Sequence, residues 1–448
     1  MTVTGELAEH ITATRFADLP PQVVAAAKDV CLDSIGVTLA GAVEARAVAD
    51  RIKAYVRSLG GDPRCSVITG GFQTNPLNAA FANGVMAHVL DYEPMMYPLT
   101  HPTSPVLPPL LALAEAEGHS GAEVLTALAV GFEVQALLRR AGHGMALYRL
   151  HPPGVVGPFG AAAACARLLE LTPQQVCRAI GIAGSRAGGL TANTGTMTKS
   201  THPANAGRMG LEAALLARLG WTAHEDVLDT GGFADLFFGQ YDFAPLRAYG
   251  DPWFLHTPGV MIKNFPSQSY THHAIDAAIE LRERYQPDPS AIEDVEIEST
   301  KRSVVDRPRP RDGLEGKFSI QYVTAVALLD GRVTMDSFID ARRFAPDVEA
   351  LLPRVRLTPR AEISDDILAM HANVTATMRD GRSYTVRCDR PRGMWGRPLT
   401  RAELVAKFED CAKRALRPDR LARVRELVEA LDQQPGVGAL MALLRDGA

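Results

Sequence analysis

The sequence lacks the patterns by which several classes of protein are recognised. Its 448 residues contain six cysteines, none in CxxC spacing, so neither a disulfide framework nor a cysteine zinc site is indicated. It has no P-loop and no GxSxG segment, and no glycine pair follows a convincing strand as a dinucleotide-binding fingerprint requires. No stretch approaches about 18 residues without a polar interruption. We therefore expect no nucleotide cofactor and no membrane span.

The charge of the chain is small and favours no class of partner. The formal net charge of −4 gives no general attraction to nucleic acid or to acidic membranes. Residues 1–16 contain no basic segment followed by an apolar one, so we expect a cytoplasmic protein. An anionic ligand must therefore be bound by local groups.

The apolar residues, 46% of the chain, recur mainly with helical spacing. In residues 21–41 they repeat at three- and four-residue steps, and Gly41 predicts the end of that helix. Similar patterns predict helices at residues 108–118, 121–138, 160–169, 173–183 and 210–219. The first part of the chain is thus expected to form an all-helical domain.

The pattern changes after Tyr270. Residues 295–300 and 355–358 alternate apolar with polar side chains, and residues 374–386 do so on both sides of an Asp-Gly pair, which is a hairpin signal. Helical sequence lies between these strands and indicates an α+β unit. Helical sequence returns at residues 401–444 and is expected to pack back on the first helices.

The prediction as a whole is a mainly α protein of two domains. A chain of this length exceeds one ordinary core. The large helical domain is discontinuous, with residues 1–268 and 397–448, and the smaller α+β domain takes residues 269–396.

The first group of residues capable of chemistry contains His88, Asp91, Glu93 and His101. It brings two imidazoles and two carboxylates into a short stretch of sequence. Asp91 and Glu93 end a helical pattern and enter a proline-rich loop, and loops held by rigid helices commonly carry catalytic groups. The alternative is structural. His88 and Asp91 would then share a hydrogen bond at the helix end, and His101 would lie on the surface.

A second concentration contains Lys199 and His202, after a segment rich in threonine, glycine and asparagine. A cation and an imidazole three residues apart suit the binding of a carboxylate. We expect them in a loop that opens into a helix at residues 207–219, where backbone N–H groups would also face an anion. His151 precedes another helix start and would add an imidazole. Alternatively, His151 lies in an ordinary loop and Lys199 is merely exposed.

A third concentration lies at the junction of the two expected domains and contains Lys263 with the adjacent His272 and His273. Adjacent histidines occur in zinc sites, but no HxxxH or CxxC partner completes a ligand set. His272 would equally cap the helix that begins near Ala274. Tyr322 enters a further helix, which by itself indicates a core tyrosine.

Taken together, these segments resemble the MmgE/PrpD family over nearly the whole chain. The matching segments keep the family's order and spacing at residues 33–41, 83–91, 100–108, 157–164, 199–202, 262–266, 318–331 and 399–408. The resemblance implies an enzyme that dehydrates 2-methylcitrate, decarboxylates cis-aconitate or epimerises iminodisuccinate, without a cofactor. It also implies a homodimer whose protomers combine the helical domain with an α+β lid.

The resemblance also indicates which residues form the site. Active-site positions fall on Asp91, His101, His151, Lys199, Lys263 and Tyr322. Residues 93–95 read Glu-Pro-Met where the dehydratases and decarboxylases have an Asp-Asp-Thr-like continuation, and Gln268 stands where the decarboxylases have a histidine. The substrate contacts predicted on this basis are Lys263, His151, His202, Glu93, Met95, Gln268 and His272.

The chemistry shared by this family is proton transfer at a carbon beside a carboxylate, which is a weak acid unless the developing negative charge is stabilised. We expect Lys199 and Lys263, assisted by His202, to bind the carboxylates of a small di- or tricarboxylic acid. His101 is the expected general acid or base, because an imidazole titrates near neutral pH, and Asp91 would orient it.

Several alternatives stay open at this point. Tyr322 is expected to donate a proton to the opposite face or to a leaving hydroxyl, and if it and His101 straddle the reacting carbon, one pair serves both elimination and epimerisation. Lyase and epimerase are therefore not separated. A catalytically silent polycarboxylate-binding homologue is the second class, and a metal-dependent hydrolase resting on His272 and His273 is the third.

Overall fold

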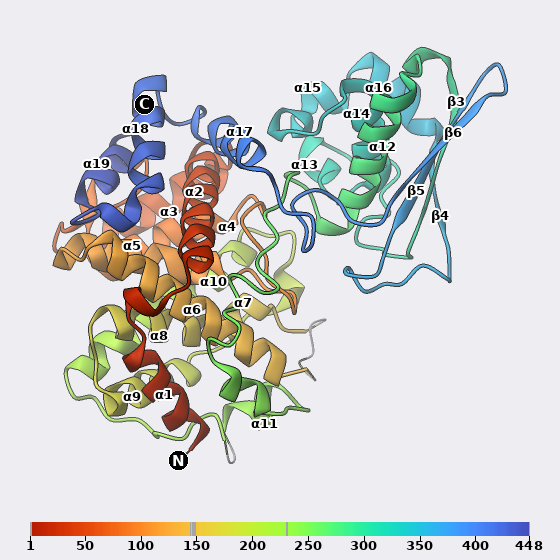
Figure 1. The fold of residues 1–448 in the computed structure, drawn as a ribbon. Coiled ribbons are helices and arrows are strands. Elements are labelled where there is room, and N and C mark those ends of the chain that lie inside the picture. The colour runs from red at the N-terminus through yellow and green to blue at the C-terminus, as the bar shows by residue number, and fades with distance from the viewer. Residues whose placement is uncertain (1, 144, 146–148, 230–231, 448) are drawn as a thin grey trace. The chain divides into compact units, whose positions relative to one another are not determined.

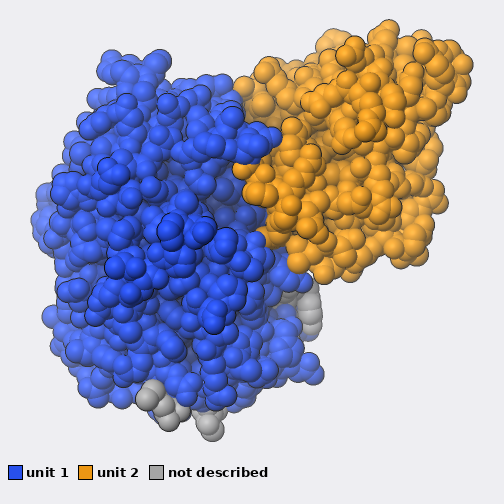
Figure 2. Space-filling view, viewed as in Figure 1, with its two compact units in different colours: residues 1–262, 400–448 blue, residues 263–399 orange. Residues whose placement is uncertain are grey.

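The computed structural model describes residues 2–143, 145, 149–229 and 232–447. The chain forms two compact units, coloured separately in Figure 2. Unit 1 contains residues 1–262 and 400–448, and unit 2 contains residues 263–399. The divisions therefore fall at 262/263 and 399/400, where the sequence analysis places them at 268/269 and 396/397.

Unit 1 is built mainly of helices. They are α1 (Val3–Ala13), α2 (Pro21–Glu44), α3 (Arg46–Leu59), α4 (Pro76–His88), α5 (Thr103–Glu117), α6 (Gly121–Ala141), α7 (Pro152–Val155), α8 (Gly157–Leu168), α9 (Pro173–Gly184), α10 (Thr198–Arg218), α11 (Phe233–Phe237), α17 (Arg401–Ala412), α18 (Pro418–Glu429) and α19 (Gly438–Asp446). The short strands β1 (Cys65–Ser66) and β2 (Gln73–Thr74) pair antiparallel. Helices α4, α5, α6, α8 and α10 pack against one another at the centre (Figure 1).

One of these central helices, α6, is long and apolar enough to cross a membrane by length and composition alone. However, 89% of its most apolar 18-residue window is buried inside the protein. That degree of burial is typical of a core helix, which is apolar all round because other elements surround it.

Unit 2 is an α+β unit. Its helices are α12 (His272–Tyr285), α13 (Gly313–Gly316), α14 (Ile320–Asp330), α15 (Asp340–Arg343) and α16 (Pro346–Leu351), and its strands are β3 (Ile292–Ser299), β4 (Val355–Pro359), β5 (Ala372–Met378) and β6 (Ser383–Cys388). The sheet order is β4-β3-β5-β6, with β3 and β4 parallel and the other neighbours antiparallel. Helices α12 and α14 pack on this sheet and enclose a largely aliphatic core.

The predicted mainly α fold is confirmed, and so is the hairpin of unit 2. Val374 pairs with Val386 across β5 and β6, and Gly381 in the turn has φ +87°, a conformation that glycine adopts without a steric cost.

Three predicted helix ends are wrong. Helix α2 continues past Gly41 to Glu44, because Gly41 lies where α2 crosses α4 and does not cap the helix. Helix α5 begins at Thr103, since Pro105 falls in its first turn, where a backbone N–H would have no helical partner in any case. Helix α10 begins at Thr198 and tolerates Pro203 inside it, so residues read as a loop are helical.

Helices α17 and α18 return to unit 1 and pack against α2. Lys407 of α17 forms an ion pair with Asp33 of α2, with 2.6 Å between nitrogen and oxygen, and both side chains are buried. A Cβ atom at Gly36 would lie 3.1 Å from the Phe408 ring, so the glycine allows α17 to approach α2 closely. The C-terminal segment is therefore part of the helical core.

Gly41 is predicted to be intolerant of even a methyl group. A Cβ atom there would lie 2.1 Å from the carbonyl oxygen of Met86, so Gly41→Ala forces α2 and α4 apart. We expect a loss of about 1–3 kcal/mol in the free energy of unfolding, measured by urea titration. Gly438→Ala is the matched control, because nothing lies within 4 Å of a Cβ atom there. Equal stability of the two variants would contradict this account of the α2–α4 crossing.

Candidate active site

The centre of the site is the loop between the end of α4 at His88 and the start of α5 at Thr103. Asp91 adopts φ +53°, which Asp tolerates better than most residues, and its backbone N–H donates to the His88 carbonyl oxygen over 2.9 Å. Further along, Met95 and Met261 exchange backbone hydrogen bonds of 2.9 and 2.8 Å. The loop is thus held near its start and at its middle by backbone contacts within unit 1.

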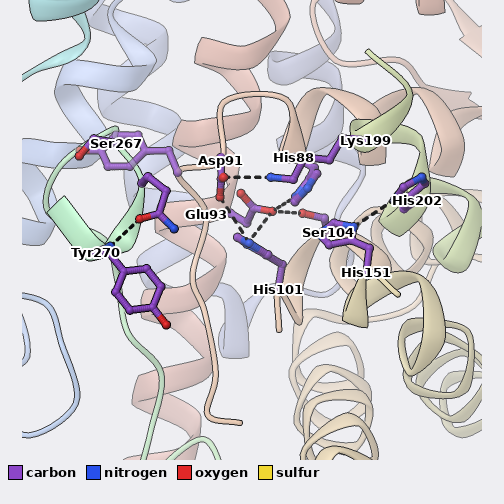
Figure 3. Close-up of polar contacts among 12 residues, drawn as sticks. His88, Asp91, Glu93, His101, Ser104, His151, Lys199, His202, Ser267 and Tyr270 are labelled. Atoms are coloured by element: carbon purple, nitrogen blue, oxygen red, sulfur yellow. Dashed lines mark hydrogen bonds and ion pairs between the residues drawn. The ribbon is translucent and has the colours of Figure 1, made fainter. Parts of the chain in front are cut away.

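Glu93 is the hydrogen-bonding centre of this loop. Its side chain is fully buried, and its Oε1 atom accepts a hydrogen bond from the Ser104 hydroxyl over 2.7 Å and a short one from Nδ1 of His88 (Figure 3). Burial alone would raise the pKa of Glu93, but the adjacent His88 and His101 hold that pKa well below its usual range. Burial lowers the pKa of His88 to about 4. The arrangement is therefore an ionised carboxylate that accepts from a neutral imidazole.

His101 lies between two carboxylates. Its Nδ1 atom is 3.3 Å from Oε1 of Glu93, and its Nε2 atom is 3.4 Å from Oδ1 of Asp91. The ring is only 7% exposed, so the structural alternative of a surface histidine is wrong. The expected helix-end hydrogen bond between His88 and Asp91 is present, from the Asp91 backbone N–H to the His88 carbonyl oxygen, while the His88 ring faces Glu93. An imidazole between two acceptors is well placed to take up and return a proton.

Lys199 joins this group from α10. Its Nζ atom donates to Oδ2 of Asp91 over 2.9 Å, and both side chains are partly exposed. The prediction that Lys199 and His202 lie in a loop before a helix at residues 207–219 is wrong, since both lie in the first turns of α10. Three residues apart on a helix, they share one face. The ion pair with Asp91 shows that Lys199 is not merely an exposed lysine, although its side chain is partly exposed.

His151 and His202 extend the cluster with a pair of imidazoles. Their Nδ1 atoms lie 3.2 Å apart, and the His151 ring centroid is 5.4 Å from that of His88 and 6.3 Å from that of His101. Burial lowers the pKa of His151, and the nearby His88, Lys199 and His101 lower it further. Burial and Lys199 also lower the pKa of His202. Both rings are therefore neutral near pH 7 and can donate or accept hydrogen bonds.

The site residues expected from the sequence include the unit 1 members of this cluster apart from Ser104. Asp91, Glu93, His101, His151, Lys199 and His202 come together as a group (Figure 3). Met95 is buried in the same loop as Glu93. Ser104 was missed because a serine in the first turn of a helix is common. Its contact with Glu93, eleven residues away, leaves no local pattern.

The other predicted site residues belong to unit 2. Lys263 is buried. The Gln268 side chain accepts a hydrogen bond of 2.6 Å from the Tyr270 backbone and so caps a short helical turn (Figure 3). Helix α12 begins at His272 itself, without a side-chain cap, so the predicted capping role of His272 is wrong. Its Nε2 atom lies 3.3 Å from the Ser267 carbonyl oxygen.

Tyr322 lies in the core of unit 2. The side chain is fully buried, and its hydroxyl donates a short hydrogen bond to the Ser337 carbonyl oxygen. Burial raises the pKa of this phenol. A role as proton donor stays a prediction, and it requires the hydroxyl to leave that carbonyl.

A metal ion is the other occupant that the cluster suggests. One ligand atom each from His88, Glu93 and His101 lies within 4.8 Å of the other two. Two imidazoles and a carboxylate are ligand types that bind transition metals. However, Glu93 Oε1 already accepts two hydrogen bonds, one of them from His88. A metal bound at that oxygen would therefore displace the His88 proton. Among the described residues, no group of three potential ligands includes His272 or His273.

The chain matches two models of one family. The MmgE/PrpD N-terminal domain matches residues 5–246, and the MmgE/PrpD C-terminal domain matches residues 265–433. The chain is 32% identical over 459 residues to a cis-aconitate decarboxylase of Mus musculus, covering 99% of this chain and 93% of that protein. It is 26% identical over 310 residues to a 2-methylcitrate dehydratase of Escherichia coli (strain K12), covering 63% of each.

We predict that Zn²⁺ does not stabilise the protein through Glu93, because its Oε1 atom already accepts hydrogen bonds from His88 and Ser104. The check is a thermal melt of chelator-treated protein with and without added Zn²⁺, beside Glu93→Gln, which removes the charged ligand at nearly constant size. A metal at 100 times its dissociation constant would add about 2.7 kcal/mol. Such a gain in the wild type, lost in Glu93→Gln, would show a metal site.

Tyr322→Phe is predicted to lower stability, and its turnover decides between a core tyrosine and a proton donor. The variant loses one buried hydrogen bond, to Ser337, at a cost of about 1 kcal/mol, and keeps the ring in the core. Urea titration and a steady-state assay measure the two effects on one preparation. A large fall in kcat with unchanged stability would instead assign the hydroxyl to the reaction.

Proposed function

The chain belongs to the MmgE/PrpD family, and from this membership we propose that it is a lyase that releases carbon dioxide or water from a small di- or tricarboxylic acid. The reaction proceeds by proton transfer at a carbon beside a carboxylate and uses no cofactor. Decarboxylation of cis-aconitate or a close analogue is the first candidate. Its support is the similarity to cis-aconitate decarboxylases over 99% of this chain, against 63% for the dehydratase.

The observation that carries the proposal is the placement of His101 between Asp91 and Glu93. The buried Glu93 fixes one ring nitrogen at 3.3 Å, which leaves the other, facing Asp91, to exchange a proton with the substrate. A carbanion formed by loss of carbon dioxide needs a proton, and a dehydration needs one removed. A fixed imidazole can act as acid or base, so it serves either direction.

Lys199 supplies the positive charge for a substrate carboxylate. Its ammonium is 19% exposed at the side chain and carries three donors, of which Asp91 takes one. The neutral rings of His151 and His202 add hydrogen bonds without adding charge. A polycarboxylate is thus held by one ion pair and several neutral contacts, which fixes the reacting carbon beside His101.

Epimerisation is the second candidate, since an imidazole can remove a proton from one face of the carbon and a second acid can return a proton to the opposite face. It differs from the first candidate only in that no leaving group departs. A homodimer, implied by the family resemblance, is part of the same proposal. Residues 93–95 differ from the Asp-Asp-Thr-like sequence of the dehydratases and decarboxylases, but they keep a carboxylate, because residue 93 is a glutamate.

The direct test is proton NMR of the purified protein in deuterated water with cis-aconitate, citrate, 2-methylcitrate and iminodisuccinate. A decarboxylated product carrying deuterium is the expected result for cis-aconitate. A new alkene from citrate or 2-methylcitrate shows dehydration, and deuterium exchange alone shows epimerisation. No change in any acid would overturn the proposed lyase activity on this substrate class.

His101→Asn is predicted to lower turnover about 100-fold or more, since general acid–base catalysis depends on the ring. The control is His119→Asn, which removes another imidazole that lies 3.3 Å from a glutamate, Glu123, but at the protein surface. Both variants are assayed on the acid found active above. Near-normal turnover of His101→Asn would remove His101 from the mechanism.

A further inference from the structure

A buried arginine at the end of α6 has no carboxylate partner. Arg139 lies in the last turn of this helix and is only 3% exposed. Its Nη1 atom donates to the sulfur of Met145 over 3.8 Å, which is a weak interaction because a thioether is a poor acceptor. In the part of the chain that the structure describes, its Nε atom has no hydrogen-bond partner. The guanidinium is thus removed from water with little in return.

This burial is unfavourable for the protein alone. Burial lowers the pKa of Arg139 to about 10, and the phenol of Tyr97 acts weakly in the opposite direction. The guanidinium therefore keeps its charge near pH 7, whereas a phenol is neutral there. A buried charge without a counter-ion is costly. An anionic ligand that paired with Arg139 would recover that cost.

The chain offers Arg139 no obvious counter-ion of its own. Residues 143–150, which follow α6, contain neither aspartate nor glutamate. Glu133 is the acidic residue of α6 nearest in sequence, but six positions along a helix place it on another face. Its carboxylate accepts a hydrogen bond from the Phe254 backbone N–H over 2.7 Å.

The face of α6 that carries Arg139 lies against the loop of the candidate site. Gln135 is one helical turn before Arg139, and residues four apart on a helix are neighbours on one face. The Gln135 amide donates to the carbonyl oxygen of Pro102, the residue after His101, over 3.0 Å. Tyr97, which acts on the pKa of Arg139, belongs to the same loop. The arginine is therefore beside the loop that holds His101, and all of these residues belong to unit 1.

A carboxylate is the anion that suits this position. The forked N–H groups of a guanidinium match the two oxygens of a carboxylate, and such pairs are among the stronger hydrogen-bonded contacts in proteins. The acids proposed as substrates carry two or three carboxylates, of which Lys199 pairs with one. A second cation, at a different point, would bind another carboxylate and restrict the orientation of the acid.

We propose that Arg139 binds a carboxylate of the substrate other than the one paired with Lys199. It adds a second ion pair to the contacts described above, and it favours acids with at least two carboxylates. The identity of the ligand rests on the proposed function, but binding of a polycarboxylate is measurable without turnover. Arg139 binds and orients the acid, and it transfers no proton.

The test compares wild type, Arg139→Met and Arg140→Met, all as full-length chains. Methionine keeps the aliphatic stem of the arginine and removes its charge. Arg140 is the matched control, because it is the next residue of α6 but is exposed and lies over the Phe254 ring, 4.6 Å from the centroid. The probe is propane-1,2,3-tricarboxylate, which has neither the alkene of cis-aconitate nor a hydroxyl that can leave.

Three quantities are measured. Titration calorimetry gives the Kd of the probe, thermal melts with and without the probe give its stabilising effect, and a steady-state assay gives kcat and KM for the acid that the wild type converts. We expect Arg139→Met to weaken the probe about 10-fold or more, since a hydrogen bond to a charged group is lost. KM should rise by a similar factor with a smaller change in kcat, and Arg140→Met should match the wild type.

The melting temperature separates this role from a structural one. Without the probe, Arg139→Met should melt at or above the wild type, because the variant no longer buries an uncompensated charge. An arginine needed for the fold would instead lower the melting temperature when replaced. A wild-type Kd and KM in Arg139→Met would overturn the proposal.

A further variant and the assay itself keep the result decisive. If Arg139→Met does not fold, Arg139→Lys replaces it, because lysine keeps the charge but cannot form the forked pair, and a wild-type Kd there would overturn the proposal. If the wild type converts none of the acids while its Kd depends on Arg139, the lyase function fails and the binding role stands. Normal conversion with a Kd independent of Arg139 gives the reverse.

Discussion

The site depends on keeping the charge of Glu93 in an interior that excludes water. An ionised carboxylate there must be paired, because an unpaired charge in a medium of low dielectric is strongly unfavourable, and Glu93 is paired through its Oε1 atom. The pairing comes from His88 at the end of α4, from the hydroxyl of Ser104 in the first turn of α5, and from the ring of His101 in the loop between them. The same contacts that satisfy Glu93 therefore fix the loop and the orientation of His101.

Local patterns were enough to predict the fold class and the members of the loop. Hydrophobic spacing indicates the helices, an Asp-Gly turn indicates the β5–β6 hairpin, and residues 88–101 are close in sequence, so their meeting in space needs no long-range information. Lys199 and His151 come from distant elements, α10 and the start of α7. Only the family resemblance, and not a spacing rule, pointed to their presence beside Asp91.

Where prediction from the sequence failed, a contact distant in sequence decided the outcome. Gly41 has the appearance of a helix end, but its lack of a side chain serves the crossing with Met86 of α4. Prolines in α5 and α10 have the appearance of breaks, yet the packing of these helices at the centre of unit 1 outweighs the lost hydrogen bonds. Likewise, nothing local shows that the Tyr322 hydroxyl is bound by the Ser337 carbonyl.

The charges of the cluster also connect binding to chemistry. Lys199 forms an ion pair with Asp91. Asp91 lies near Nε2 of His101, and Glu93 lies near Nδ1 of the same ring. In the proposed reaction, a substrate carboxylate bound by Lys199 would compete with Asp91 for the donors of that ammonium. The contact between Asp91 and His101 would then change on binding, whereas the buried Glu93 keeps its place beside the other ring nitrogen.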